Sequence, residues 1–224
     1  MQTEIPDSFN NSKNRRQPIL AETAQEWYEV NADFFAEECE EIRFETIHSS
    51  FLRYMPQQSC RILEIGSGTG RDAAGLANLG HVVVAVEPSN ELRTRAQLRH
   101  TQANIRWLDD KLPKLGKVIQ LGDRYDVIFL SAVWMHLAPS ERISAFALIV
   151  SLLKPMGLVY ITLRHGPFEE IEGFWDIPDY EVMALARDYE LIQLDQVHES
   201  DLLGRRDIRW TRFTFISGTD GIVV

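Results

Sequence analysis

The feature of this sequence with the most evident chemistry is a glycine-rich turn with an acid in front of it. The turn reads Glu64-Ile-Gly66-Ser67-Gly68-Thr69-Gly70 and follows the short apolar run of residues 61–65. Glycines allow a tight turn and let a ligand approach the backbone closely. The helix expected after the turn adds unpaired N–H donors and the positive end of its dipole. The segment is therefore predicted to form a ligand-binding crevice.

A second acid, Glu87, ends the next apolar run, Val82–Val86, and lies 21 positions beyond Gly66. A carboxylate at this spacing can accept hydrogen bonds from both hydroxyls of an adenosine ribose. Glu87 could also simply begin the turn that it shares with Pro88. The order of strand, glycine turn, helix, strand and terminal acid favours a nucleoside site.

The spacing and charge of the turn distinguish two kinds of cofactor. Dinucleotide sites space their glycines G-x-G-x-x-G, whereas this chain has G-x-G-x-G followed by Arg71. The Glu64 carboxylate would repel a pyrophosphate and attract a cation. S-adenosylmethionine carries a sulfonium and an ammonium group, so the charges favour this cofactor over a nicotinamide dinucleotide.

Strand and helix patterns alternate along the chain, as is typical of βαβ units with a parallel sheet. We expect a Rossmann-like, doubly wound α/β fold, mostly parallel, with helices on both faces and an antiparallel C-terminal strand. Strands are predicted at residues 61–65, 82–86, 104–108, 125–130, 158–163, 190–197 and 208–217. Helices are predicted at residues 71–79, 90–99 with Ser89 as a cap, 139–153 and 179–187.

The 224 residues suit one α/β domain with a substantial core. Apolar residues in the segment 21–56 recur at helical spacing up to Pro56, which predicts an N-terminal helical cap with one apolar stripe. The expected division is a mobile tail at 1–20, the cap at 21–56, the main domain at 57–217 and a C-terminal tail at 218–224.

The motifs together resemble those of class I S-adenosylmethionine-dependent methyltransferases, from about Arg61 to Leu163. The opening Trp27–Phe35 and the run Gly70–Ala73 are in addition similar to small bacterial methyltransferases of the tellurite-resistance type. The segments that carry the resemblance to the class are Glu64–Gly70, Val84–Ser89, Trp107–Pro113, Asp126–Leu137 and Leu153–Gly157.

The resemblance implies a role for each cofactor residue. Glu64 and the glycine turn face the methionine part, while Glu87 and its neighbour Pro88 meet the ribose. Asp110, with Asp109 as the second choice, bonds the adenine amino group, and Leu108 or Lys111 flanks the ring. Ser131 and Ala132 lie beneath the cofactor. For Arg71 and Asp72, a ligand contact and a structural salt bridge are both open.

A sulfonium methyl group is already activated, so the enzyme needs to align the reactants and at most remove one proton. His136 follows a strand end and is the first candidate for that base. Tyr28 and Arg164 are the other catalytic candidates. The plainer explanation is a bond to the backbone for His136, core packing for Tyr28 and a surface loop for Arg164. Phe168, Phe174 and Trp175 could form a lid. Trp210 and Arg212 could reach the pocket, although packing of Trp210 under a helix is the simpler expectation.

Composition limits the partners of the chain. With 23 Lys and Arg against 33 Asp and Glu, its net charge of −10 disfavours nucleic acid. No apolar run reaches the roughly 18–20 residues of a membrane span. Two cysteines without a spacing motif indicate a reduced, cytoplasmic protein, and the six scattered histidines predict no metal site.

The expected acceptor is a small molecule, methylated at an oxygen, nitrogen or sulfur atom by a monomer or homodimer. Four alternatives stay open: a protein or peptide methyltransferase, a cofactor-binding scaffold without catalysis, a nucleic-acid methyltransferase and a nicotinamide oxidoreductase.

Overall fold

A mixed seven-stranded sheet organises the chain, whose computed structural model describes residues 18–167 and 172–219. The strand order is β3-β2-β1-β4-β5-β7-β6. The first five strands pair in parallel, and β7 lies antiparallel between β5 and β6, so the predicted fold class is confirmed. The strands are β1 (Arg61–Ile65), β2 (Val82–Val86), β3 (Ile105–Leu108), β4 (Tyr125–Leu130), β5 (Leu153–His165), β6 (Ile192–Ser200) and β7 (Arg209–Ile216).

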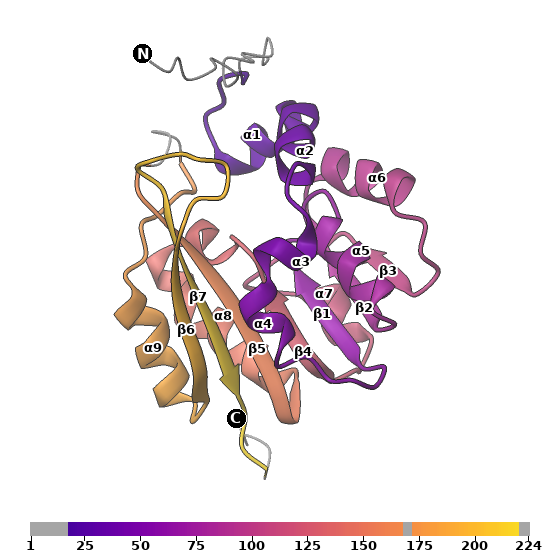
Figure 1. Cartoon of the computed structure of the whole chain (residues 1–224), viewed down its shortest axis with the longest axis vertical. Helices are drawn as coiled ribbons and strands as arrows, with labels where there is room; N and C mark the ends of the chain where they lie inside the picture. The colour runs from indigo at the N-terminus through magenta and orange to yellow at the C-terminus, as the bar shows by residue number, and fades with distance from the viewer. Residues whose placement is uncertain (1–17, 168–171, 220–224) are drawn as a thin grey trace, which may run out of the picture.

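Helices cover both faces of the sheet, and a helical cap stands over one end of it (Figure 1). One face packs against α3, α4 and α5, and the other against α7, α8 and α9. The cap consists of α1 and α2, which lie beside α6. The helices are α1 (Ala24–Val30), α2 (Ala32–Glu40), α3 (Phe44–Ile47), α4 (Ser49–Leu52), α5 (Arg71–Asn78), α6 (Asn90–Arg99), α7 (Gly116–Gln120), α8 (Pro139–Ser151) and α9 (Asp179–Asp188), with a 3₁₀ turn η1 (Trp134–His136).

Local sequence explains the elements next to the site. β2 is a continuous run of small and β-branched apolar residues, which suits a strand covered on both faces. The hydroxyl of Ser89 accepts a hydrogen bond from the Leu92 amide and caps α6, as predicted. Gly70, with φ +81°, directs the chain from the glycine turn into α5.

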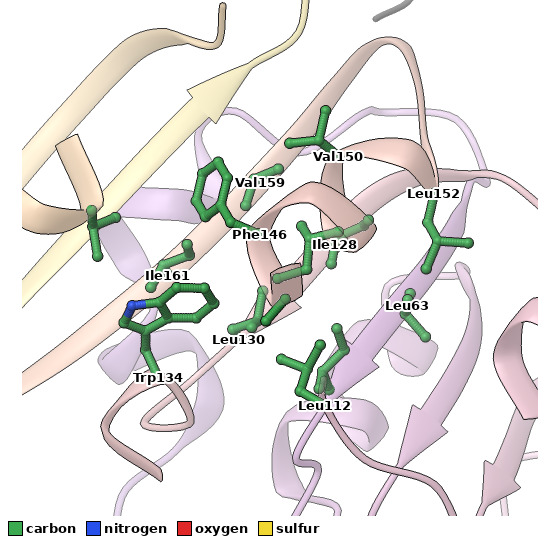
Figure 2. Packing of buried hydrophobic residues seen from close by; sticks show 14 of the residues in the cluster. Leu63, Leu112, Ile128, Leu130, Trp134, Phe146, Val150, Leu152, Val159 and Ile161 are labelled. Atoms are coloured by element: carbon green, nitrogen blue, oxygen red, sulfur yellow. The ribbon is translucent and has the colours of Figure 1, made fainter. Parts of the chain in front are cut away.

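The larger core lies between the sheet and α8 and α9 (Figure 2). Trp134 and Phe146 pack edge to face there, with ring centroids 5.8 Å apart, and both are fully buried. Trp134 belongs to η1, which directly follows β4. The core therefore fixes the start of the segment that carries His136 to the site.

The predicted N-terminal helix is wrong in its continuity, because residues 24–52 form four short helices instead of one. Asn31 ends α1 and begins α2, and Arg43 is extended before α3. His48 separates α3 from α4, since its buried ring bonds the Tyr160 hydroxyl in β5. Tertiary contacts of His48 thus outweigh the helical pattern of the sequence.

The structure also differs from the expected elements at two places, and it bears on Trp210 and on the N-terminal segment. The helix α7 was not predicted at all, and β5 begins five residues before the expected position. The Trp210 indole donates a hydrogen bond to Asp201, and its packing under a helix stays a prediction. Of the expected N-terminal tail, residues 1–17 lie outside the described residues, but Ile19 makes two backbone hydrogen bonds to the Asn31 side chain.

Gly75 offers a test of the packing between α3 and α5. A Cβ at this position would lie 2.3 Å from the Phe44 ring. Alanine normally stabilises a helix interior by about 1 kcal/mol over glycine, but overpacking costs about 1–3 kcal/mol. We therefore expect Gly75→Ala to lower the free energy of unfolding in chemical denaturation, and Phe44→Leu to relieve part of this loss. A more stable Gly75→Ala protein would contradict this packing.

Candidate active site

The glycine turn leaves β1 and is held against the end of β2. The amides of Gly66 and Ser67 both donate to the Val86 carbonyl, at 2.8 and 2.9 Å. Gly66, Gly68 and Gly70 have φ of +71°, +53° and +81°, a region that side chains other than glycine rarely adopt. A Cβ at Gly66 would lie 2.5 Å from Cγ2 of Val133, so the segment after β4 packs directly on the turn. The geometry requires glycine here.

The Glu87 carboxylate reaches the turn from the end of β2. Its Oε2 accepts a hydrogen bond from the Gly68 amide at 2.7 Å, and its Oε1 accepts one from the Ser89 amide at 2.8 Å. The side chain is buried, and burial raises the pKa of Glu87 to about 7 against the lowering effect of these two donors. Glu87 and the glycine turn, predicted as parts of one site, are in direct contact.

Two of the three predicted catalytic residues form a hydrogen-bonded pair. The Tyr28 hydroxyl lies 3.2 Å from Nε2 of His136, and Nδ1 of His136 lies 2.9 Å from the Gly173 carbonyl oxygen. A carbonyl can only accept, so Nδ1 carries the proton and Nε2 is a free acceptor for the Tyr28 O–H. Burial lowers the pKa of His136, which keeps the ring neutral, and burial raises the pKa of Tyr28.

Arg164, the third candidate, ends β5 on the same side of the sheet. Its positive charge lowers the pKa of Tyr28 in opposition to burial, and its Nη2 donates to the Pro167 carbonyl at 2.8 Å. Phe174 packs against His136 with ring centroids 4.7 Å apart. Trp175 donates its amide to the Met135 carbonyl at 3.0 Å, while Phe168 lies outside the described residues. Part of the predicted lid is thus placed next to the histidine.

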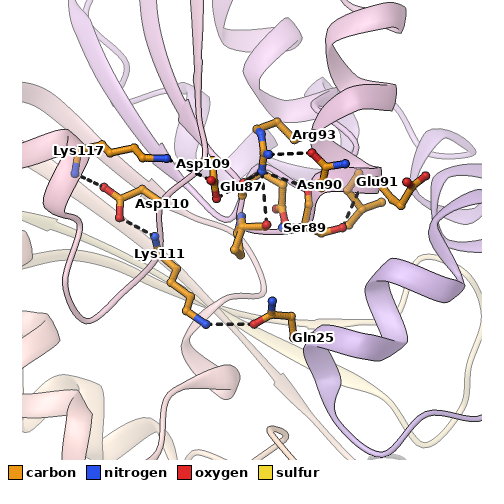
Figure 3. Close-up of polar contacts among 12 residues, drawn as sticks. Gln25, Glu87, Ser89, Asn90, Glu91, Arg93, Asp109, Asp110, Lys111 and Lys117 are labelled. Carbon is orange, nitrogen blue, oxygen red and sulfur yellow. Dashed lines mark hydrogen bonds and ion pairs between the residues drawn. The ribbon is translucent and has the colours of Figure 1, made fainter.

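The residues predicted to bind adenine are largely engaged with the protein itself (Figure 3). Oδ2 of Asp110 accepts from the amides of Lys117 and Val118, which caps the start of α7. Asp109 is more exposed and pairs with the Lys117 ammonium at 3.1 Å. The Lys111 ammonium donates to Gln25 of α1 at 3.0 Å. Their contact with adenine stays a prediction, and Asp109 has the more accessible carboxylate of the two acids.

Arg71 and Asp72 form a structural salt bridge at the start of α5. Nε of Arg71 lies 2.7 Å from Oδ1 of Asp72, and its Nη1 donates to the Cys39 carbonyl of α2 at 2.7 Å. The buried Asp72 also lies 3.0 Å from Nε2 of His48. This network ties the cap to the helix that follows the glycine turn.

Ser131 and Ala132 lie directly after β4, at the same edge of the sheet as the turn. Ala132 has a positive φ of +58°, and its amide donates to the Thr162 hydroxyl at 2.8 Å. Thr69 donates its hydroxyl to Glu40 of α2 at 3.3 Å. Both contacts place predicted cofactor residues in fixed positions around the turn.

Sequence reasoning missed several residues that the cap contributes. Phe35 covers Gly68, since its Cε1 lies 3.4 Å from where a Cβ of Gly68 would be. Glu29 caps α6 by accepting hydrogen bonds from the amides of Asn90 and Glu91. The aromatic sequence of the cap indicated its importance, but only the fold shows which rings meet the turn.

Comparisons with known proteins show what the central part of the chain resembles. Residues 62–157 match the family of methyltransferase domains. This central segment of the chain is therefore similar to methyltransferase domains. No curated protein matches the sequence. Two of the solved structures compared below hold a bound cofactor, S-adenosylhomocysteine in one and S-adenosylmethionine in the other.

Solved structures share the methyltransferase fold at low sequence identity. The 1,6-didemethyltoxoflavin-N1-methyltransferase of Burkholderia thailandensis is 17% identical with a TM-score of 0.68, over 91% of this chain and 93% of that one. The magnesium protoporphyrin IX methyltransferase of Synechocystis PCC 6803 is 12% identical with a TM-score of 0.63, over 85% and 84% of the two chains. TehB from Haemophilus influenzae is 15% identical with a TM-score of 0.61, over 84% and 67%.

The residues around the glycine turn suit a ligand that carries positive charge. Oε2 of Glu64 is buried and has no hydrogen-bond partner, and Glu87 is a second buried carboxylate nearby. A cationic ligand would supply the charge that these acids lack. Within residues 18–167 and 172–219, no cluster of His, Cys, Asp and Glu could hold a metal ion, and no helix has the length and apolar character to cross a bilayer.

Proposed function

We propose that this protein transfers the methyl group of S-adenosylmethionine to an oxygen, nitrogen or sulfur atom of a small-molecule acceptor. The observation that carries the proposal is the Tyr28–His136 pair, which provides a neutral imidazole. Tyr28 also packs against Phe35, the ring that covers Gly68 of the glycine turn. The named activities of the two neighbours from Burkholderia and Synechocystis, each on a small molecule, support the same class of acceptor.

In this proposal each cofactor group has a partner in the chain. Glu87 holds the ribose hydroxyls, Glu64 and the glycine turn meet the methionine part, and Asp109 or Asp110 meets the adenine. The cofactor supplies an activated methyl group on a positively charged sulfur. Ser131 and Ala132 support it from below. Glu87 must exchange the Gly68 amide for the ribose, and the Phe35 ring must move off Gly68, when the cofactor binds.

His136 is the base of the proposed reaction. Its Nε2 accepts the acceptor's proton as the methyl group is transferred, because Nδ1 stays bonded to the Gly173 carbonyl. The acceptor displaces the Tyr28 hydroxyl from Nε2, and Tyr28 then lines the acceptor site with Phe174. Arg164 orients the acceptor through its guanidinium. The aromatic rings of the cap exclude water from the reacting atoms.

The two described cysteines, Cys39 and Cys60, are both free thiols, which fits a reducing compartment. A cytoplasmic location is therefore part of the proposal.

The test of the cofactor site is calorimetric titration with S-adenosylhomocysteine. We expect Glu87→Ala to weaken binding by about 10- to 100-fold, because a hydrogen bond to a charged group contributes about 1.5–3 kcal/mol. Glu45→Ala serves as the control, because Glu45 is an exposed carboxylate on α3 that pairs with Arg43, and this variant should bind the ligand as wild type does. Wild-type protein that gives no heat and no thermal shift with this ligand would overturn the proposal.

The acceptor class is tested next, by following S-adenosylhomocysteine release with pools of small metabolites and with protein extract. Release that requires a small-molecule pool supports the proposal. Release only with a protein fraction assigns the acceptor to proteins or peptides instead.

A further inference from the structure

Glu64 is a buried acid whose carboxylate is only partly satisfied. The residue is 2% exposed and its Oε2 has no hydrogen-bond partner. In register it lies between Ala85 of β2 and Phe129 of β4, whose side chains offer no hydrogen bond. An unpaired carboxylate charge in such a place costs several kcal/mol, as a general estimate for buried ions. The neutral acid avoids that cost.

The charges that face Glu64 come from α5 and from the end of β2. On α5, Asp72 adds a second negative charge, and Arg71 is the nearby cation. The Arg71 guanidinium is already bonded to Asp72 and to the Cys39 carbonyl of α2. His48, from the junction of α3 and α4, faces Asp72 rather than Glu64. From β2, Glu87 adds a third carboxylate.

These surroundings favour the protonated form of Glu64. Burial and the negative charge of Asp72 raise its pKa well above the ordinary value, and Glu87 adds to this while Arg71 opposes it. Glu87 differs, because the amides of Gly68 and Ser89 donate to its two oxygens and stabilise the ionised form. Arg93 of α6 also lowers the pKa of Glu87, while the charge of Glu29 in α1 raises it. The group best placed to hold a proton is therefore Glu64.

The methionine part of S-adenosylmethionine ends in an ammonium group, which prefers an ionised carboxylate as its neighbour. We propose that Glu64 holds a proton while the cofactor site is empty and releases it to solvent when this ammonium group enters. The inference rests on the proposed function. Protons and charges balance in this step. The proton leaves Glu64 for the buffer, and the positive charge of the incoming ammonium group compensates the carboxylate that remains.

Two consequences follow for ligand recognition. Cofactor affinity rises with pH, by about tenfold per pH unit where binding releases one proton. Adenosine has the ribose and adenine but no ammonium group, so its binding leaves Glu64 protonated. Glu64 thereby selects ligands that carry the methionine cation over plain nucleosides.

The experiment is calorimetric titration of the full chain with S-adenosylhomocysteine at neutral pH, in two buffers of different ionisation enthalpy. We expect wild type to release about one proton more per bound ligand than Glu64→Gln does, by linkage. Adenosine is expected to give no such difference between the two proteins. Glu45→Gln, which changes an exposed carboxylate on α3, serves as the matched control and should match wild type.

Equal proton release by wild type and Glu64→Gln would overturn the inference. If Glu64→Gln fails to fold, infrared difference spectroscopy of wild type gives the same answer. The carbonyl band of a protonated carboxylic acid should disappear when S-adenosylhomocysteine binds, and a band that persists would contradict the proposal. Absence of any binding would instead count against the proposed function.

Discussion

Replacing His136 with glutamine is expected to lower kcat by about 10²- to 10⁴-fold, the usual contribution of a positioned general base. Nε2 of His136 is the ring nitrogen without a proton, because Nδ1 donates its hydrogen to the Gly173 carbonyl. Cofactor affinity should stay within about threefold of wild type, because His136 is proposed to act on the acceptor and not to hold the cofactor. The measurement is S-adenosylhomocysteine release with the identified acceptor, next to calorimetry with S-adenosylhomocysteine.

The pH profile separates a base from a merely structural histidine. A base must be neutral, so the rate rises with pH and becomes constant above the pKa of the group. Burial lowers the pKa of His136, so we expect the wild-type plateau to begin below the ordinary histidine range near 6.5. The rise should be missing in His136→Gln. Tyr28→Phe keeps the ring and should keep this profile.

An equal loss of stability and of activity in His136→Gln, with an unchanged pH profile, would assign the histidine to packing. Phe174→Leu offers a comparison, because it changes the neighbouring ring without removing a proton acceptor.

The strands next to the cofactor site could be predicted from sequence because their signals are local. The apolar run of β2 is continuous, and β4 is apolar except for Asp126. Both strands are short, are bounded by polar residues and are found at the predicted bounds. Ser89 was predicted as a cap from its position alone, and it caps α6. The contact of Glu87 with Gly68 follows from the same logic, since adjacent parallel strands end at one edge of the sheet.

Other features depend on contacts between distant residues, and the sequence pattern does not contain them. Tyr28 and His136 are separated by 108 positions, and each was a candidate without a known partner. Asp110 caps α7, a helix of five residues that has no clear pattern of its own. His48 interrupts the N-terminal helix because of Tyr160 and Asp72, which lie far along the chain. Tertiary structure decides all three.

Asp72 carries the largest expected effect on stability. Its carboxylate is buried between the Arg71 guanidinium, at 2.7 Å, and Nε2 of His48, at 3.0 Å. Removing one partner of a buried ion pair leaves the other charge uncompensated and costs about 3–5 kcal/mol. We expect Asp72→Asn, which keeps the volume and removes the charge, to lower the free energy of unfolding by this amount. Chemical denaturation at neutral pH measures it.

Asp109→Asn is the matched control, because Asp109 pairs with Lys117 at the surface and exposed pairs contribute about 0–1 kcal/mol.

The contribution of Asp72 should depend on pH. Burial alone would raise the pKa of Asp72, but the neighbouring Arg71 and His48 lower it below its ordinary value. The unfolded chain therefore takes up this proton at a higher pH than the folded protein does. The contribution is complete above the unfolded pKa of about 4 and is lost as the pH falls toward the folded pKa. The difference between wild type and Asp72→Asn should shrink in that acidic range, and a difference independent of pH would show that packing, not charge, is responsible.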